Sequence, residues 1–304
     1  MGWTARRIPG QGGRTAVVTG ANSGLGYVTA RELARRGCRV VLGCRSRGRG
    51  EQALARLLSE VPEADAELRQ LDLADLKSVR AFAAALPDEP LHLLVNNAGL
   101  MAVPHARTAD GFEMQFGVNH LGHFALTGLL MDRLLAAEGA RVVTVSSLMH
   151  VLGNVDLRDP HCERRYRRWM AYGRSKTANL LFTHELARRV NGRDLIAAAA
   201  HPGYSATELQ TKGPRLAGDR VGERFMRLAN AAVGSPAELG AAATLYAATS
   251  EEVVPDSFTG PRVLGLRGGP GRSWRAPWTR DDSTAERLWG LSEDLTGVRF
   301  DALG

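Results

Sequence analysis

The 304-residue sequence predicts an α/β fold: a single domain with a doubly wound, mostly parallel sheet of seven strands and with helices on both faces. Three observations predict it. Short runs rich in Val and Leu alternate with longer stretches of helical period. The runs are continuously apolar, which is typical of strands buried on both faces of a parallel sheet. No internal repeat or linker divides residues 1–304.

The alternating elements can be placed along the chain. Strands are expected at 15–20, 39–44, 66–73, 91–99, 140–147, 194–203 and 261–265. Helices are expected near 24–37, 48–60, 75–86, 110–137, 172–191 and 235–249. Three long stretches break this rhythm, at 148–170, 204–234 and 266–283. Because ligands bind outside the carboxyl ends of parallel strands, where such loops emerge, we expect these loops to shape a binding site.

The composition points to a soluble protein with a sizeable core, since 44% of the residues are hydrophobic and 23% are charged. No apolar run approaches the ~18 residues that a membrane-spanning helix needs, and the N-terminus lacks an apolar signal segment. Gly2 does not fit a myristoylation site, because Arg6 stands where Ser or Thr is required. We therefore expect a cytoplasmic protein without a membrane span.

The cysteines and the net charge indicate which kinds of site and partner the sequence does not support. Cys38, Cys44 and Cys162 lack the spacing of a disulfide framework or a zinc site, so we expect reduced thiols and no metal. The net charge of +7 would suit an anionic partner. No nucleic-acid-binding motif accompanies it, so we expect no nucleic-acid partner; an arginine-rich composition with a phosphate-bearing ligand explains the charge as well.

The first predicted strand runs directly into "TGANSGLG" (19–26), in which Gly20, Gly24 and Gly26 punctuate the turn before a helix. A tight turn needs residues that tolerate positive φ, and backbone amides approach a pyrophosphate closely only where no Cβ intervenes. The N-terminus of the following helix attracts the anion. This strand–turn–helix context predicts a dinucleotide site, with a purely structural glycine turn as the alternative.

The second predicted strand ends in "GCRSRGRG", where a site for NAD would place an acidic residue to bind the ribose 2′-hydroxyl. No acidic residue occurs between Glu32 and Glu51, and Arg45 stands at the strand end with Arg47 and Arg49 beyond it. A guanidinium suits a 2′-phosphate. We therefore predict NADP rather than NAD, recognised mainly by Arg45; a solvated basic turn is the alternative.

Two further strand ends carry polar signals. Asp72, in "LDLAD", is placed to reach an adenine. In "NNAG" (96–99), Asn96 could tie neighbouring strands together and Gly99 could let a ribose approach. These assignments are plausible from position alone.

The candidate reacting groups are Tyr172 and Lys176, which share a helical face at i and i+4. Only three of the 39 basic residues are lysines, so this one is conspicuous. An ammonium nearby would lower the pKa of the phenol, which could then exchange a proton with a carbonyl or alcohol oxygen. Ser147, after the fifth predicted strand, could donate to the same oxygen, or could simply cap a turn.

Together these motifs resemble the short-chain dehydrogenase/reductase family, whose fold is the doubly wound Rossmann fold. The pieces are "TGANSGLG", "NNAG", "GVNHLGHF", "VSS", "YGRSK" and "HPG", in family order from Thr19 to Thr207. Longer segments are similar to the sequences of the branch that contains retinol dehydrogenases and protochlorophyllide reductases. Examples are "VNHLGHF", "SKTANLLFTHELARR" and "RLWGLSEDLTGV". That likeness covers nearly the whole chain.

The resemblance implies roles for individual residues. Tyr172 would be the acid/base, Lys176 would lower its pKa and bind a ribose, and Ser147 would orient the carbonyl. Asn119 would kink its helix and hold a water that links Lys176 to solvent. The nicotinamide side would include Pro202, Gly203 and Thr207. The other cofactor contacts would be Gly20, Asn22, Ser23, Gly24, Leu25, Gly26, Arg45, Asp72, Leu73, Asn97, Ala98 and Gly99.

Residues 15–145 would then be mainly the cofactor-binding half, and 146–304 would carry the Tyr/Lys helix, the substrate loops and the C-terminal segment. The serine lies 25 residues before Tyr172, a spacing that matches the retinol dehydrogenase branch. Strand alternation allows only one of Ser146 and Ser147 to face the site, and the pattern of the branch favours Ser147.

Other features have plainer explanations. His120 and His123 are expected to pack rather than bind a metal. The run "ERRYRRW" (163–169) is expected to be mainly a solvated face, with contact to an anionic lipid or acidic substrate as alternatives. Five loop residues are expected either to line an apolar substrate pocket or, equally, to fill the core: Met101, Met149, Leu152, Tyr204 and Met226.

The sequence thus predicts an NADP(H)-dependent oxidoreductase that transfers hydride between nicotinamide and a carbonyl or alcohol of a lipophilic small molecule. A non-catalytic dinucleotide sensor or scaffold is the first alternative, although a pure binder would need Lys176 but not Tyr172. A nucleic-acid binder is the second. The resemblance leaves a homodimer or a homotetramer open.

Overall fold

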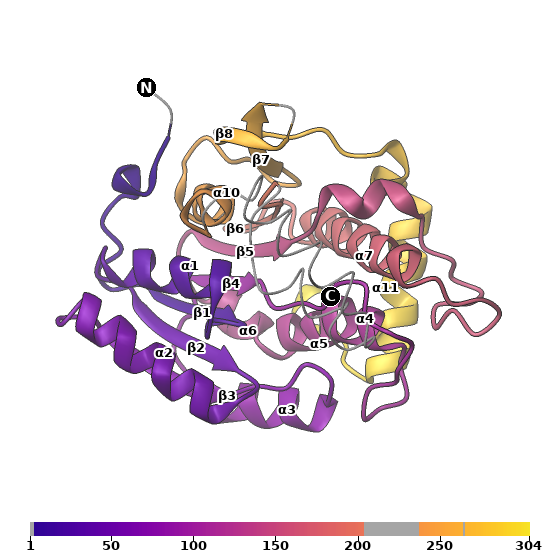
Figure 1. Cartoon of the computed structure of the whole chain (residues 1–304), viewed down its shortest axis with the longest axis horizontal. Helices are drawn as coiled ribbons and strands as arrows, with labels where there is room; N and C mark the ends of the chain where they lie inside the picture. The colour runs from indigo at the N-terminus through magenta and orange to yellow at the C-terminus, as the bar shows by residue number, and fades with distance from the viewer. Residues whose placement is uncertain (1–2, 204–236, 264) are drawn as a thin grey trace, which may run out of the picture.

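The computed structural model describes residues 3–203, 237–263 and 265–304 (Figure 1). Its centre is an eight-stranded sheet in the order β3-β2-β1-β4-β5-β6-β7-β8. Every neighbouring pair is parallel except β7 and β8. The strands are β1 Thr15–Thr19, β2 Arg39–Cys44, β3 Ala66–Gln70, β4 Leu93–Asn96, β5 Ala140–Val145, β6 Leu195–Ala200, β7 Phe258–Val263 and β8 Arg267–Arg272.

The doubly wound α/β fold is confirmed, but the predicted count of seven strands was one short. The eighth strand, β8, comes from the stretch 266–283, which was expected to be irregular. Its sequence "RGGPGR" contains no β-branched or aromatic residue and gave no local signal. The strand forms because it pairs antiparallel with β7 at the edge of the sheet, where Pro270 is tolerated opposite Pro261.

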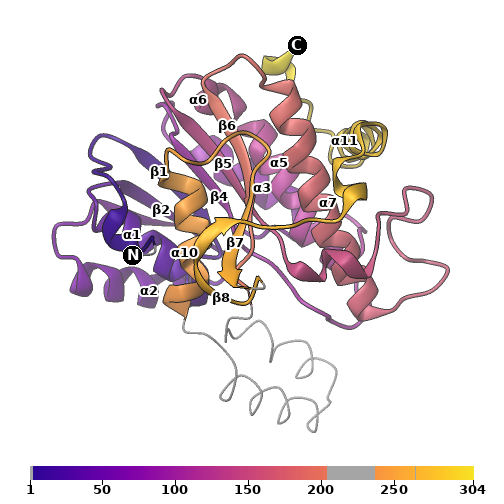
Figure 2. The same cartoon turned by 90° about the horizontal axis from the view of Figure 1, so that it is seen from above.

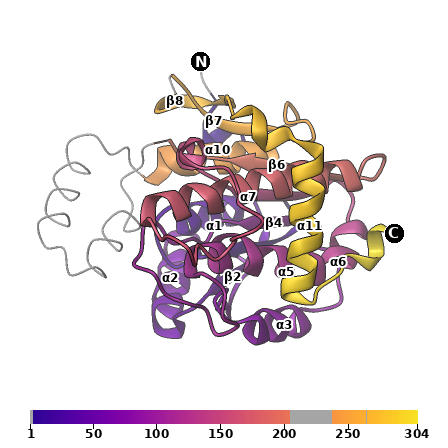
Figure 3. The ribbon, with the colours of Figure 1, turned by 90° about the vertical axis from the view of Figure 1, so that its right-hand side faces the viewer.

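Helices cover both faces of the sheet (Figures 1 and 2). One face carries α1 (Gly24–Ala34), α2 (Arg47–Glu60) and α10 (Ala237–Thr249). The opposite face carries α3 (Leu76–Ala85), α5 (Gly122–Leu129) and α7 (Arg168–Arg189), and α11 (Asp282–Thr296) packs across α7 and α5 (Figure 3). Short helices α4 (Met114–Phe116) and α6 (Met131–Leu135) flank α5. Among these, α11 was not expected from the sequence.

Alternate side chains of the central strands enter two separate cores, which is why these strands are mostly apolar. In β1, Val17 points into the core beneath α3, α5 and α7, and Val18 into the core beneath α1, α2 and α10. Trp289 explains the position of α11, because its ring stacks on Phe182 and contacts Phe124. The C-terminal helix thereby completes the first core.

The predicted helix at 110–137 is not continuous. A π-helical segment, Gly117–Leu121, joins α4 to α5, and a second break at Leu130 precedes α6. Such π segments widen the helix by one residue and are frequent at functional sites. This one passes beneath the carboxyl ends of the central strands, where the turns of the site emerge.

Candidate active site

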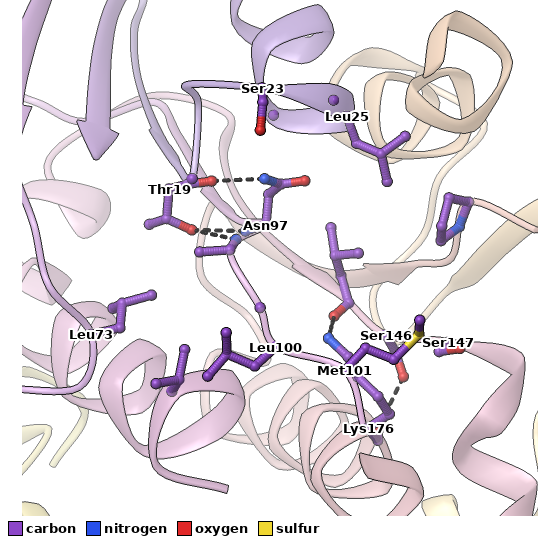
Figure 4. A pocket seen from close by; sticks show the side chains of 18 of the residues that line it. Thr19, Ser23, Leu25, Leu73, Asn97, Leu100, Met101, Ser146, Ser147 and Lys176 are labelled. Atoms are coloured by element: carbon purple, nitrogen blue, oxygen red, sulfur yellow. Dashed lines mark hydrogen bonds between the residues drawn. The ribbon is translucent and has the colours of Figure 1, made fainter. Parts of the chain in front are cut away.

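A cavity of about 580 Å³ opens at the carboxyl ends of the central strands (Figure 4). It is lined by the turns that follow β1 to β6 and by the first half of α7. All the predicted site residues line it except two: Asn119 lies behind the wall, and Thr207 lies outside the described residues. Side chains separated by more than 150 residues of sequence are thus brought together as expected for a doubly wound sheet.

The backbone of the turn after β1 is not covered by side chains at its glycine positions. Gly20 and Gly24 adopt φ of +66° and +55°, which residues with a Cβ rarely take. A Cβ on Gly26 would collide with the carbonyl of Gly20 and the side chain of Asn97. Nicotinamide dinucleotides carry a pyrophosphate, and this turn fits one because its amides and the N-terminus of α1 are unobstructed.

Thr19, which the sequence did not single out, connects this turn to "NNAG". Its hydroxyl oxygen accepts the backbone N–H groups of Asn97 and Ala98, both at 2.9 Å. The side-chain amide of Asn97 donates to the Thr19 carbonyl at 2.8 Å (Figure 4). Asn96 points away from the cavity and donates to Thr127 at 3.1 Å. The only sequence signal for Thr19 was its place as the last residue of β1.

The end of the cavity beside β2 is basic. Arg45 is exposed and lines the cavity, as does Arg49 in the first turn of α2. Arg47 does not, because it points outward to form an ion pair with Glu51 at 2.9 Å. Asp72 is the one carboxylate among the described lining residues, and it accepts the N–H of Ala74 at 3.0 Å.

Tyr172 is only 4% exposed, and its phenol shares a hydrogen bond with Ser147. Burial raises the pKa of Tyr172 to about 12, a shift that the bond to Ser147 only partly opposes. The net direction is therefore opposite to the decrease that the neighbouring Lys176 alone suggested. The Lys176 ammonium lies 5.8 Å from the centre of the phenol ring and donates to the Val145 carbonyl at 2.9 Å.

Burial also acts on Lys176 itself, whose pKa falls to about 8. Both groups are removed from water, which shifts each pKa toward the neutral form of the group. The neutral phenol is the form that can give a proton to a substrate oxygen.

The two adjacent serines have different partners. The hydroxyl of Ser146 donates to the carbonyl of Lys176 at 2.8 Å and is buried (Figure 4). Ser147 contacts Tyr172 and also accepts the N–H of Met149 at 3.2 Å, which caps the 3₁₀ turn Leu148–Leu152. Ser147 is therefore both the hydroxyl beside the phenol and a capping residue, the two roles that the sequence left as alternatives.

Asn119 lies in the π-helical segment and is fully buried. Its side chain accepts the N–H of Leu100 at 2.7 Å and donates to the carbonyl of Leu100 and to the Ser175 hydroxyl, each at 2.9 Å. A Cβ on Gly99 would lie 3.2 Å from the Asn119 side-chain oxygen, so this wall of the cavity is closely packed. Asn119 thus holds the loop after β4 against α7.

His120 and His123 pack separately rather than as a pair. His120 is 2.8 Å from the hydroxyl of Ser292 in α11. His123 donates from Nδ1 to the carbonyl of Asn119 at 3.0 Å, and its Nε2 accepts the Thr19 hydroxyl at 2.9 Å. Within the residues that the structure describes, no group of three or more His, Cys, Asp or Glu side chains is placed to hold a metal ion.

The other end of the cavity is apolar. Met101 and Met149 line it as proposed, Leu152 is exposed elsewhere, and Tyr204 and Met226 lie outside the described residues. The sequence missed the further apolar lining residues Leu100, Leu148, Trp169 and Leu266.

Trp169 belongs to the basic run at 163–169, which is therefore not only a solvated face. Its ring meets that of Tyr172 edge-on at 6.4 Å, and the i, i+3 spacing of the two on α7 was a usable signal. Tyr166 is anchored too, since its hydroxyl donates to the Val103 carbonyl at 2.8 Å. The arginines at 164, 165 and 167 remain exposed.

Comparison with known proteins decides the family. The profile of the family described as short chain dehydrogenase matches residues 14–215. The chain belongs to this family. Retinol dehydrogenase 12 of Homo sapiens is 42% identical over 291 residues, covering 95% of this chain and 88% of that protein. Retinol dehydrogenase 13 of Homo sapiens is 43% identical, covering 94% and 85%.

Solved structures agree with this assignment. The crystal structure of an uncharacterized protein from Mycobacterium paratuberculosis is 46% identical, with a TM-score of 0.82 and 99% of both chains covered. Salutaridine reductase from Papaver somniferum, at 22% identity and a TM-score of 0.63 over 81% of this chain and 99% of that one, shares the fold.

As a short chain dehydrogenase, the protein is an oxidoreductase of alcohol and carbonyl groups that depends on a nicotinamide dinucleotide. The predicted family and its retinol dehydrogenase branch are thus confirmed. Among its described helices, none combines the length and the apolar character needed to cross a bilayer.

Proposed function

We propose that this short chain dehydrogenase is NADP(H)-dependent and transfers hydride between nicotinamide and the carbonyl or alcohol carbon of a lipophilic small molecule, with Tyr172 as general acid/base. One observation carries the proposal: a single cavity has a bare glycine turn at one end and the Ser147–Tyr172 hydroxyl pair at the other. A dinucleotide that spans the two brings its nicotinamide to the hydroxyls. A non-catalytic sensor would not need that pair.

The chemistry divides between the cofactor and the chain. When bound, the reduced nicotinamide supplies a hydride. Ser147 donates a hydrogen bond to the substrate oxygen, and Tyr172 delivers the proton to it. A phenol with a pKa of about 12 is protonated at neutral pH and ready to donate, which favours reduction. Lys176, with a pKa of about 8, is mostly charged at pH 7 and stabilises the phenolate that forms.

The substrate class is proposed from the apolar end of the cavity, where Leu100, Met101 and Trp169 place no charge beside the reacting groups. The retinol dehydrogenase relatives are named for an apolar alcohol, which supports the same class. The direct test is NADPH oxidation over a panel of apolar aldehydes, ketones and quinones, with charged keto acids for comparison. Tight NADPH binding without turnover on any of them would favour the sensor.

Cofactor choice is proposed to rest on Arg45, which has no acidic competitor at the end of β2. The Arg45→Asp variant is expected to raise KM for NADPH by about 10–100-fold, because a charged hydrogen-bond donor to the 2′-phosphate is lost, while KM for NADH stays the same or falls. Steady-state kinetics with both cofactors measure this. Arg47→Asp is the matched control, since Arg47 faces Glu51 outside the cavity. An unchanged preference for NADPH in Arg45→Asp would contradict the assignment.

The two serines give a paired prediction. Ser147→Ala is expected to lower kcat about 10²-fold, because one donor to the substrate oxygen is lost. It also removes the cap on the Met149 N–H, at about 1 kcal/mol of unfolding free energy. Ser146→Ala removes the bond to the Lys176 carbonyl and is expected to cost about 1 kcal/mol of unfolding free energy with a far smaller loss of kcat. Turnover and urea unfolding of both variants decide between the serines, and a reversed pattern would assign the substrate contact to Ser146.

A further inference from the structure

The segment 273–276 follows β8 and lies outside residues 14–215, which the family profile matches. Two buried histidines connect it to the active site. His150 stands three residues after Ser147, and His201 follows β6, two residues before Gly203. Neither imidazole lines the cavity, so neither can contact a ligand there.

Each ring uses both nitrogens. Nδ1 of His150 lies 2.7 Å from the carbonyl oxygen of Ser147, and its Nε2 lies 3.0 Å from the backbone nitrogen of Ala276. Nδ1 of His201 lies 3.1 Å from the backbone nitrogen of Gly203, and its Nε2 lies 2.8 Å from the hydroxyl of Ser273.

These partners determine the protonation of both rings. A carbonyl can only accept, so His150 carries its proton on Nδ1 and accepts the Ala276 N–H at Nε2. The Gly203 N–H donates into Nδ1 of His201, so that ring carries its proton on Nε2 and donates to Ser273. Both rings are neutral, and burial lowers both pKa values, that of His201 to about 4.

Packing holds the rings in these orientations. Phe258 of β7 touches both, with ring centroids 5.7 Å from His150 and 4.9 Å from His201. A Cβ on Gly260 would collide with the imidazole of His201, so that ring fits only because residue 260 is glycine. Trp274 covers His150 at 6.1 Å. The two histidines are therefore held in fixed orientations between the segment 273–276 and the active-site residues Ser147 and Gly203.

We propose that His150 and His201 are positioning residues through which the segment 273–276 sets the places of Ser147 and Gly203. His150 holds the backbone of the residue that orients the substrate oxygen. His201 holds the backbone of Gly203 at a φ of +67°, which is one of the several conformations open to a glycine. The inference rests on the proposed function for the role of Ser147, and it adds the segment after β8 to the parts of the chain that position the site.

The test changes the segment and leaves the histidines intact. Ser273→Ala removes the partner of His201, and Ser273→Thr keeps it. Ala276→Pro replaces the N–H that binds His150 with a ring methylene, at a φ of −60° that proline accepts. Ser257→Ala is the matched control, because its hydroxyl donates to Val254 in the turn before β7. Kinetics, NADPH fluorescence titration and urea unfolding are measured for all.

Ser273→Ala is expected to weaken NADPH binding by about three- to tenfold, with Ser273→Thr restoring it, because Gly203 loses its support. Ala276→Pro is expected to lower kcat by a similar factor with NADPH affinity unchanged, because only the Ser147 side is affected. The inference would be overturned if both variants kept the kcat and NADPH affinity of the wild-type protein. It would also be overturned if each variant lost kcat and affinity equally and in proportion to a lower urea midpoint.

Two outcomes need separate readouts. Should Ala276→Pro fail to fold, His150→Asn takes its place, since it keeps a donor near the Ser147 carbonyl and loses the link to Ala276. Should the wild-type protein bind NADPH but turn over no substrate, the proposed function fails alone. The difference in NADPH affinity between Ser273→Ala and Ser273→Thr then still confirms or overturns the His201 half of the inference.

Discussion

Replacing Tyr172 with Phe is expected to lower kcat for carbonyl reduction by about 10²–10⁴-fold, while NADPH binding stays nearly unchanged. The phenol hydroxyl is the proton donor beside Ser147, and its removal leaves the ring, its contact with Trp169 and the packing of α7 in place. Burial raises the pKa of this hydroxyl to about 12, so it stays protonated and able to donate at neutral pH.

Single-turnover kinetics and fluorescence titration with NADPH separate the two effects. Tyr166→Phe is the control, because Tyr166 is half-buried and, like Tyr172, hydrogen-bonded, but it donates to Val103 away from the reacting groups. Its kcat is expected to fall far less. A Tyr172→Phe protein that binds NADPH and keeps full turnover would exclude Tyr172 as the acid/base and would return the sensor hypothesis or another proton donor to consideration.

Lowering the pH from 7.5 to 5.5 is expected to reduce the free energy of unfolding by roughly 4 kcal/mol. Burial lowers the pKa of His120 to about 3 and those of His123 and His201 to about 4. These groups stay neutral in the folded protein but gain a proton in the unfolded chain below pH 6.5. The stability they contribute is therefore present above pH 6.5 and is lost as the pH falls toward 4.

At pH 5.5 each of the three histidines lowers the free energy of unfolding by about 1.4 kcal/mol, since the pH then lies one unit below the pKa of histidine in the unfolded chain. His184 acts in the opposite direction, because the bond to Asp256 raises its pKa, and it partly offsets the loss. Urea midpoints at the two pH values measure the sum. His120→Phe keeps a ring among Phe116 and Phe182 but cannot titrate, so its stability should depend less on pH. An equal dependence would contradict the prediction.

The local sequence pattern was enough to predict most strands of the sheet and the glycine turn after β1. A strand buried on both faces is apolar at most positions, so β1, β2, β4, β5 and β6 could be placed from sequence alone. The turn "TGANSGLG" was informative because glycine readily adopts the positive φ of Gly20 and Gly24, and because a Cβ on Gly26 would collide with Gly20. Tyr172 and Lys176 share a face by helical spacing alone, whatever the rest of the chain does.

The features that the sequence did not reveal depend on partners distant in the chain. The strand β8 has no β-branched or aromatic residues and exists because β7 offers an edge. The helix α11 docks because Trp289 packs against the rings of Phe124 and Phe182. The π-helical segment around Asn119 is held by Leu100 and Ser175, which local periodicity cannot report.

The sequence by itself determined the fold class, the family and which side chains meet at the carboxyl ends of the strands, because backbone geometry and apolar periodicity are local properties. Only the tertiary structure decided how those side chains behave. It separated Ser147 from Ser146, and it raised the pKa of Tyr172 where the neighbouring Lys176 alone suggested a decrease. The physical reason is desolvation: the energy of a charge depends on everything that excludes water from it, and that enclosure is assembled from the whole chain.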